Sequence, residues 1–309
     1  MERAPAACIL CGSTDRSPLI ERDGWTVHRC AGCGLGVLDP RPDREELGRL
    51  YEKEYFDSQY REGLRPGSPE MRRRISQEDH RIRFFRRFRK RGLVVDIGCG
   101  MGYFLYAARQ AGYDVTGVDI SDHAASYVRD ELGIPMRIGH IDAVEVPERT
   151  VDVATMWHFL EHTDDPRRYI EKVARWLKPD GLLVIDVPNY EGTDAQKTWR
   201  DWVGWQLPYH FYHFTPATLA LLLSQHGFEV IHSKDYHSEI IKERLRKIPG
   251  ISLFARLISL TPIQGGCGGL IAQSPSRHVP RRGHFSIFVI FDPCSPRPPM
   301  RPFWSKMNA

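Results

Sequence analysis

The chain has 309 residues, of which 41% are hydrophobic and 27% charged, and its formal net charge is +4. This composition is typical of a globular protein and excludes a disordered or largely membrane-spanning chain. The weak positive charge does not by itself indicate a nucleic-acid partner. The first residues contain no apolar stretch like that of a secretory signal, so we expect a cytoplasmic location.

Four of the seven cysteines form two Cys-x-x-Cys pairs separated by 18 residues, namely Cys8 with Cys11 and Cys30 with Cys33. An odd cysteine count without an export signal favours a metal site over a disulfide framework. Two such pairs suit tetrahedral Zn²⁺, and four thiolates leave no position for water, so we predict structural zinc. A unit of this size is too small for a stable hydrophobic core without a metal or disulfides, so residues 1–45 are expected to be a zinc-ribbon domain.

Residues 46–91 are predicted to be a helical linker or lid. The sequence favours two helical stretches around a turn at residues 66–69, and in the second stretch four apolar residues share one face. These are Ile75, Ile82, Phe85 and Phe88. The aromatic residues Tyr55, Phe56 and Tyr60 either fold over a cofactor as a lid or pack the ribbon against the next domain.

From Leu93 onwards, short apolar segments alternate with helical ones. The predicted strands are Leu93–Ile97, Tyr113–Asp119, Pro135–Ile138, Val151–Trp157, Leu182–Val187, Phe228–His232 and His284–Phe291. This alternation predicts an α/β domain over residues 92–291, with an open sheet of seven strands covered by helices on both faces. An insert at 238–283 interrupts the pattern, and the proline-rich tail at 292–309 is expected to be disordered.

A glycine loop follows the first of these strands. Its glycines are Gly98, Gly100 and Gly102, with Cys99 between the first two, and Asp96 stands just before it. Such glycines let a ligand approach the backbone closely. The acid would repel a pyrophosphate, whereas it favours a ligand that carries an ammonium and a sulfonium group. S-adenosylmethionine (SAM) is such a ligand.

Further candidate cofactor residues follow the next strands. Asp119, with Ile120 beside it, ends the second strand, where a carboxylate can accept hydrogen bonds from two ribose hydroxyls. Asp142 and Ala143 follow the third strand, where an acid can bind an adenine amino group. Trp157 and His158 end the fourth strand and are expected to line the same site.

Several motifs in this region resemble class I SAM-dependent methyltransferases. The family motif D-x-G-x-G-x-G is Asp96–Gly102, the Glu-His and Asp-Pro pairs are Glu161-His162 and Asp165-Pro166, and the motif before the fifth strand is Leu177–Gly181. The resemblance implies a mostly parallel sheet whose last strand is antiparallel, and the use of SAM.

The N-terminal region resembles that of a bacterial subgroup of these enzymes, which carries a zinc ribbon. The resemblance rests on the cysteine pairs, on Asp39–Pro42, and on Tyr51 and Tyr55-Phe56. Sugar C-methyltransferases and enzymes of glycan and natural-product pathways belong to this subgroup. It implies a small-molecule or carbohydrate acceptor.

Methyl transfer from a sulfonium requires positioning and, for some acceptors, a base. Histidine suits proton abstraction at neutral pH. We rank His210 and His213 first as catalytic candidates, then His162 and Tyr209, and expect Trp205 and the aromatic residues around them to form a wall for the acceptor. The alternative is that this aromatic run is core. The His-x-x-His spacing could also bind a metal, but the sequence shows no third ligand nearby.

Two other functions compete with this one. Ten basic residues between Arg72 and Arg91 could bind RNA, although a solvated helix face is the commoner meaning of such a run, and we expect no nucleic-acid partner. A non-enzymatic zinc-ribbon adaptor would have a degenerate cofactor loop. The basic amphipathic segment at 240–260 can lie on a membrane surface, cover the acceptor or contact a second copy. The sequence leaves the oligomeric state open.

Overall fold

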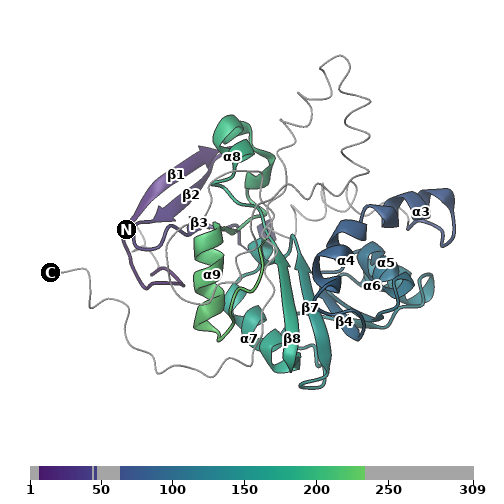
Figure 1. The fold of residues 1–309 in the computed structure, drawn as a ribbon. Coiled ribbons are helices and arrows are strands. Elements are labelled where there is room, and N and C mark those ends of the chain that lie inside the picture. Colours follow the sequence, from purple (N-terminus) through teal and green to yellow (C-terminus); the bar gives the residue numbers. More distant parts are fainter. Residues whose placement is uncertain (1–6, 44, 47–62, 234–309) are drawn as a thin grey trace, which may run out of the picture.

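The computed structural model describes residues 7–43, 45–46 and 63–233, which form two sheets (Figure 1). The larger sheet has five parallel strands in the order β6-β5-β4-β7-β8. The strands are β4 (Leu93–Ile97), β5 (Asp114–Asp119), β6 (Met136–Ile138), β7 (Val151–Trp157) and β8 (Leu177–Asp186). The order reverses between β4 and β7, and in open α/β sheets ligands bind at such a switch point, beyond the carboxyl ends of the strands.

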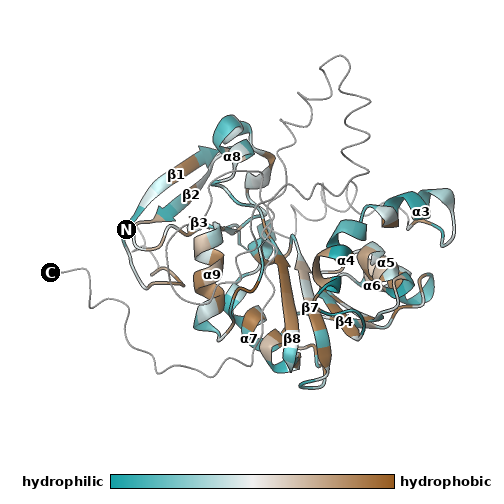
Figure 2. Ribbon diagram, viewed as in Figure 1, coloured by the Kyte–Doolittle hydropathy of each residue, from teal (hydrophilic) through white to brown (hydrophobic). Residues whose placement is uncertain are grey.

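The central strands are apolar because helices cover both of their faces. All seven residues of β7 are buried, and β7 and β8 are hydrophobic along much of their length (Figure 2). Helices α4, α5 and α6 lie on one side of the sheet, and α7 and α9 on the other (Figure 1). The helices are α3 (Pro69–Ser76), α4 (Asp79–Arg86), α5 (Tyr103–Gln110), α6 (Asp122–Asp130), α7 (Pro166–Trp176), α8 (Thr193–Thr198) and α9 (Pro216–Gln225).

Local capping fixes where several helices begin. The side chains of Ser121 and Asp165 accept hydrogen bonds from the first turns of α6 and α7. Thr215 and Thr218 form a reciprocal capping box at the start of α9, whose first residue is Pro216. These helix starts are therefore set by residues next to them in the sequence.

Parts of the predicted α/β pattern are wrong. Residues 228–232 form no strand, only a single bridge at His232, and Val230 and Ile231 are 39% and 37% exposed, so little burial drives pairing there. The strand β8 starts at Leu177 and includes the expected turn before Leu182. Phe88 is 42% exposed, because α4 ends at Arg86 before the predicted apolar face is complete.

The smaller sheet is antiparallel and contains β1 (Arg16–Arg22), β2 (Trp25–Cys30), β3 (Gly36–Leu38) and β9 (Tyr212–His213), in that order. Asp23 and Gly24 join β1 to β2 with positive φ angles of 55° and 81°, as a two-residue hairpin loop requires. The first three strands come from the N-terminal 45 residues, but the fourth comes from far along the chain.

The four cysteines of the two pairs lie together beside this sheet. Their sulfur atoms all lie within 4.8 Å of one another, with Cys8 Sγ 3.6 Å from Cys33 Sγ and Cys11 Sγ 3.5 Å from Cys30 Sγ. Ligands of a tetrahedral zinc with Zn–S bonds of 2.3 Å are about 3.8 Å apart, so the arrangement fits the ion. The glycine after each pair has a positive φ angle, 73° for Gly12 and 87° for Gly34.

The N-terminal sheet is joined closely to the rest of the chain. Gly36 pairs with His213, and a Cβ on this glycine would lie 2.8 Å from the Cβ of His213. The hydroxyl of Tyr190 donates to the carbonyl of Gly34, and Gln225 Nε2 donates to the carbonyl of Leu10 at 2.7 Å. The predicted zinc-ribbon domain therefore shares a sheet and a core with the α/β domain.

Several predicted features lie outside the described residues. They are the aromatic lid at Tyr55, Phe56 and Tyr60, the seventh strand, the insert at 238–283 with its membrane-surface segment at 240–260, and the tail at 292–309. Within the described ranges, the helices are too short or too polar for any of them to cross a bilayer.

We expect Cys30→Ser to remove the zinc of the cysteine site and to lower the melting temperature. It should leave SAM affinity largely intact, because residues 1–45 contribute none of the candidate cofactor residues. It should nevertheless reduce methyl transfer, because β3 holds the segment that carries His213. Elemental analysis, thermal unfolding and calorimetric SAM titration measure the three effects. Wild-type protein without stoichiometric zinc at these cysteines would contradict the metal assignment.

Candidate functional site

The glycine loop connects β4 to α5 at the carboxyl edge of the sheet. Gly98, Gly100 and Gly102 have φ angles of 73°, 49° and 66°, a region that favours glycine. A Cβ on Gly98 would lie 2.1 Å from a ring carbon of Phe159. Glycine is therefore favoured at these three positions, and it leaves the backbone of the loop accessible to a ligand at this edge.

Asp119 at the end of β5 is tied to this loop. Its carboxylate accepts hydrogen bonds from the backbone N–H of Gly100 at 2.8 Å and of Ser121 at 2.9 Å. The side chain is largely buried, and burial raises its pKa above the ordinary value. The next residue, Ile120, is 73% exposed, which is unusual for a large apolar side chain and suits a flat ligand group packing on it.

Asp96 lies deeper, beneath the loop. It is 2% exposed and accepts a hydrogen bond from the hydroxyl of Thr155 on β7 at 2.5 Å. Burial raises the pKa of this carboxyl to about 8. A cationic ligand in the loop would favour its ionised form, so the acid fits the ammonium and sulfonium of SAM.

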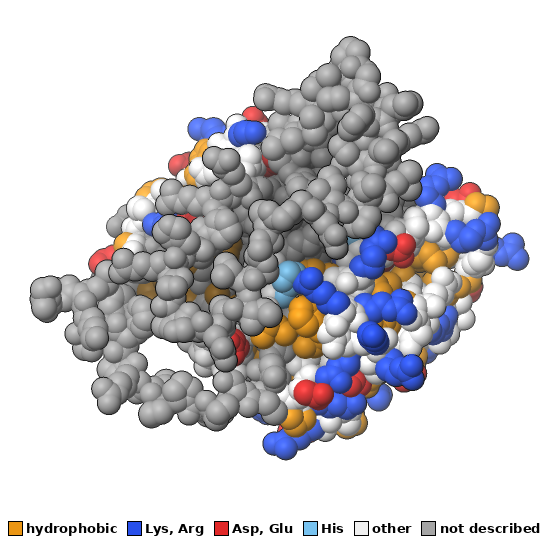
Figure 3. Space-filling view, in the orientation of Figure 1, with side chains coloured by type: hydrophobic (Ala, Val, Ile, Leu, Met, Phe, Trp, Pro, Cys, Tyr) orange, Lys and Arg blue, Asp and Glu red, His pale blue; other side chains and the backbone are white. Residues whose placement is uncertain are grey.

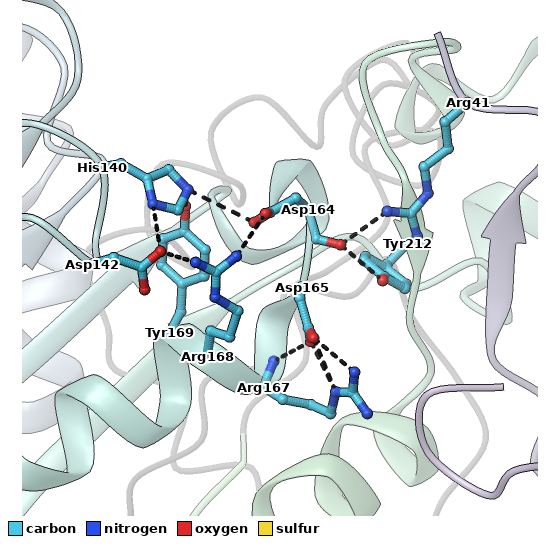
Figure 4. A network of polar contacts seen from close by, with 9 residues as sticks. All are labelled: Arg41, His140, Asp142, Asp164, Asp165, Arg167, Arg168, Tyr169 and Tyr212. Carbon is cyan, nitrogen blue, oxygen red and sulfur yellow. Dashed lines mark hydrogen bonds and ion pairs between the residues drawn. The ribbon is translucent and has the colours of Figure 1, made fainter. Parts of the chain in front are cut away.

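The predicted adenine contact, Asp142, lies in a network of polar contacts (Figure 4). Its carboxylate pairs with the guanidinium of Arg168 and lies 3.2 Å from His140 Nδ1. Arg168 also pairs with Asp164 at 3.0 Å. Asp142 and its neighbour Ala143 are exposed, so both remain accessible, but the acid already has a cationic partner.

Two of the predicted cofactor residues, Trp157 and Cys99, lie where they are poorly placed to contact a cofactor. The ring of Trp157 is 7% exposed and packs in the core against Phe104, with the guanidinium of Arg81 4.8 Å from its centroid. The sulfur of Cys99 lies 3.8 Å from the sulfur of Met136, and burial raises the pKa of this thiol well above its usual range. Cys99 is therefore a neutral thiol and a poor nucleophile.

The predicted catalytic histidines form a cluster beyond the ends of β7 and β8. The rings of His162 and His210 are 4.5 Å apart at 85°, and those of His210 and His213 are 6.1 Å apart. His162 Nδ1 lies 3.0 Å from the carbonyl of Tyr209, and His210 Nδ1 lies 2.9 Å from that of Gly204. Burial lowers the pKa of both side chains, so they are neutral at physiological pH.

His213 occupies a different environment from its neighbours. It is buried in β9, its ring packs 5.1 Å from that of Trp205, and burial lowers its pKa to about 3. The predicted acceptor wall is core here: Trp205, Phe211 and Tyr212 are 0%, 7% and 2% exposed. Trp205 is covered by Tyr190, Trp199 and Trp202, which leaves its ring no open face for an acceptor.

Two buried acids complete the cluster, and neither was singled out as catalytic from the sequence. Glu161 and Asp186 are 1% and 2% exposed, and His158 lies between them, 3.7 Å from Glu161 Oε1 and 3.5 Å from Asp186 Oδ2. Burial lowers the pKa of His158, but the two carboxylates outweigh it and raise the value to about 9, so this imidazole is a cation at neutral pH. The position of Asp186 as last residue of a strand could have indicated it.

Comparison with known proteins agrees with this geometry. A family model described as a methyltransferase domain matches residues 69–233. The chain therefore belongs to this family of SAM-dependent methyltransferases, and the glycine loop with Asp96 and Asp119 is its candidate SAM site.

Curated relatives match part of their length. A protein of Mycolicibacterium smegmatis described as a probable S-adenosylmethionine-dependent methyltransferase is 27% identical over 142 residues, which cover 44% of this chain and 52% of the relative. A ubiquinone biosynthesis O-methyltransferase of Coxiella burnetii is 32% identical over 101 residues, which cover 31% of this chain and 43% of the relative. The chain thus spans about half the length of these relatives.

Solved structures show similar chains at low identity. A SAM-dependent methyltransferase from Archaeoglobus fulgidus is 19% identical, with a TM-score of 0.44 over 71% of this chain and 93% of that one. A protein from Pyrococcus horikoshii is also 19% identical, with a TM-score of 0.46 over 60% of this chain and 94% of that one.

We expect Asp119→Ala to weaken SAM binding tenfold to a hundredfold. The reason is that hydrogen bonds to a charged group contribute about 1.5–3 kcal/mol, and the loop would also lose the acceptor of the Gly100 N–H. Asp119→Asn should lose less, because one oxygen remains. Calorimetric titration with SAM or S-adenosylhomocysteine measures the change. An unchanged dissociation constant in folded Asp119→Ala protein would show that this carboxylate does not bind the cofactor.

The raised pKa of Asp96 predicts a pH-dependent stability. In the unfolded chain this carboxyl ionises near pH 3.8, but in the folded chain it ionises near 8. The unfolded state therefore binds fewer protons between these values, and the free energy of unfolding falls as pH rises through this range, by at most about 1.4 kcal/mol per pH unit. Urea unfolding of SAM-free wild type and Asp96→Asn at pH 5 and pH 8 should show wild type losing stability relative to the variant. If the difference in unfolding free energy between wild type and Asp96→Asn is the same at both pH values, the pKa of Asp96 is not raised in the folded chain.

Proposed function

We propose that this chain transfers the methyl group of SAM to a small-molecule or carbohydrate acceptor, whose proton is removed at the cluster of Glu161, His162 and His210. The observation that carries the proposal is the position of two groups at one edge of the sheet. The glycine loop and Asp119 follow β4 and β5, and the buried histidine cluster follows β7 and β8. A cofactor and an acceptor bound at these places would meet at the switch point between β4 and β7.

When bound, SAM supplies a methyl group on a sulfonium, and the electrons of the broken carbon–sulfur bond stay on sulfur. The chain's own residues position the cofactor and accept the proton that the acceptor loses. Burial lowers the pKa values of His162 and His210, so both imidazoles are neutral, although each is a weaker base than an exposed histidine. Their Nδ1 atoms face backbone carbonyls, which leaves each Nε2 lone pair to accept the proton. The name of the Coxiella relative, an O-methyltransferase, supports a small acceptor that is methylated on oxygen.

A nucleic-acid acceptor is less well supported. Lys and Arg side chains are prominent on the face formed by α3 to α6 (Figure 3). Several of these arginines have partners within the chain: Arg74 and Arg81 pair with Glu78, and Arg89 pairs with Asp180 at 2.7 Å. A solvated helix face with internal ion pairs accounts for this surface.

We expect His210→Ala to lower turnover by about 10²–10⁴-fold and to change SAM affinity little, because the side chain lies at the acceptor side of the edge. His226→Ala is the matched control, since its Nδ1 also lies near a backbone carbonyl, that of Leu222 at 2.7 Å, but outside the cluster. Transfer from radiolabelled SAM to libraries of glycans, nucleotide sugars and small metabolites measures turnover. His213→Ala belongs in the same series. Near-wild-type turnover of both the His210 and the His213 variant would exclude these histidines from catalysis.

A further inference from the structure

We propose that Glu161, His162 and His210 bind a divalent transition-metal cation, with one coordination position left open for an oxygen of the acceptor. One carboxylate oxygen and one nitrogen from each imidazole lie within 4.8 Å of one another. This site is separate from the four cysteines. It deepens the proposed function, on which its role toward the acceptor rests. With an ion bound, the imidazole lone pairs would be used for coordination, and the ion would lower the pKa of an acceptor hydroxyl bound to it, whose proton would pass to solvent. The binding of the ion can be tested without SAM or acceptor.

The backbone determines which imidazole nitrogens are available. A carbonyl oxygen can only accept a hydrogen bond, so the Nδ1 atoms of His162 and His210, which face the carbonyls of Tyr209 and Gly204, carry the hydrogen. In the neutral rings the Nε2 atoms therefore have free lone pairs. Histidines that bind metals are oriented in this way, with the second nitrogen held by a carbonyl or carboxylate.

Glu161 supplies the negative charge of the proposed site. It is 1% exposed, and within the part of the chain that the structure describes neither of its carboxylate oxygens has a hydrogen-bond partner. Its nearest cationic neighbour is His158, at 3.7 Å, which is beyond hydrogen-bonding distance. A buried carboxylate without hydrogen-bond donors is costly, and a cation held between it and the two imidazoles would compensate this cost.

The fold holds these ligands on two segments that are tied together. Glu161 and His162 lie in the 3-10 helix η2 (Leu160–His162), directly after β7. The backbone N–H of Phe211, next to His210, donates to the carbonyl of Glu161 at 2.8 Å. This bond and the contact of His162 with Tyr209 keep the two segments in register, so that the ligands converge without a long flexible loop.

The ligand set indicates the class of ion. Two imidazoles and one carboxylate suit Zn²⁺, Mn²⁺ or Fe²⁺, whereas Mg²⁺ prefers oxygen ligands alone. Three protein ligands with a fourth position free are typical of catalytic metal sites, in contrast to the closed four-cysteine site. Tetrahedral ligands at 2.0–2.1 Å are about 3.3 Å apart, so the side chains must draw together when the ion binds.

The test is metal stoichiometry of the full chain after equilibration with Zn²⁺ and removal of free ion. Wild type should retain two equivalents. Glu161→Gln, which keeps the shape of the side chain, should retain only the equivalent at the four cysteines. Cys8→Ser should retain only the equivalent at Glu161, His162 and His210. His226→Gln is the matched control and should retain two. A wild-type chain that binds a single equivalent, lost in Cys8→Ser and unaffected by Glu161→Gln, would overturn the proposal.

Cobalt distinguishes the two sites within one folded protein. Co²⁺ at the cysteines gives intense thiolate charge-transfer absorption, whereas Co²⁺ at the histidine site should add only weak visible bands. Wild type titrated with Co²⁺ should show both components, and His162→Gln should lose the weak bands alone, so the test does not depend on the folding of Glu161→Gln. Absence of the weak component in wild type, or displacement of zinc from this site by Mg²⁺ at equal concentration, would contradict the proposal. Calorimetric SAM binding tests the proposed function separately.

Discussion

The pairing of β3 with β9 is the contact on which the rest of the site depends. Gly36 lies opposite His213, and a Cβ at position 36 would lie only 2.8 Å from the Cβ of His213. The pairing joins the N-terminal sheet, beside which the four cysteines lie, to the segment that carries His210. A metal bound by the four cysteines would thereby influence methyl transfer, because it would stabilise the strand with which that segment pairs.

The carboxyl edge of the sheet concentrates buried charge. Asp96, Asp119, Glu161 and Asp186 are each at most 8% exposed and lie at or just beyond strand ends. Their burial raises the free energy of the ionised forms unless N–H donors or cations compensate. Asp119 has two backbone N–H donors, and His158 lies between Glu161 and Asp186. An edge of this kind favours cationic ligands, which agrees with SAM and with the proposed metal ion.

The sequence by itself determined the parts of this protein that depend on local residue types. The two cysteine pairs, the glycine loop and the acid at the end of β5 were all identified from spacing, because tight turns and strand ends impose residue types on short stretches of chain. The five central strands were also predicted, since apolar runs between helices have few other solutions. The strand expected at 228–232 does not form, because a strand there would need burial against the rest of the fold, which a local sequence pattern does not report.

Only the tertiary structure decided which distant residues meet. The sequence placed Trp205, Phe211 and Tyr212 around an acceptor, but packing buries them, since aromatic side chains are equally suited to a core and to a binding wall. Likewise, the sequence showed no third ligand near His210 and His213, whereas the fold brings Glu161 and His162, which lie much earlier in the chain, close to His210 and not to His213. Local spacing fixes the chemistry of each segment, whereas the crossings of the sheet fix which segments share a site.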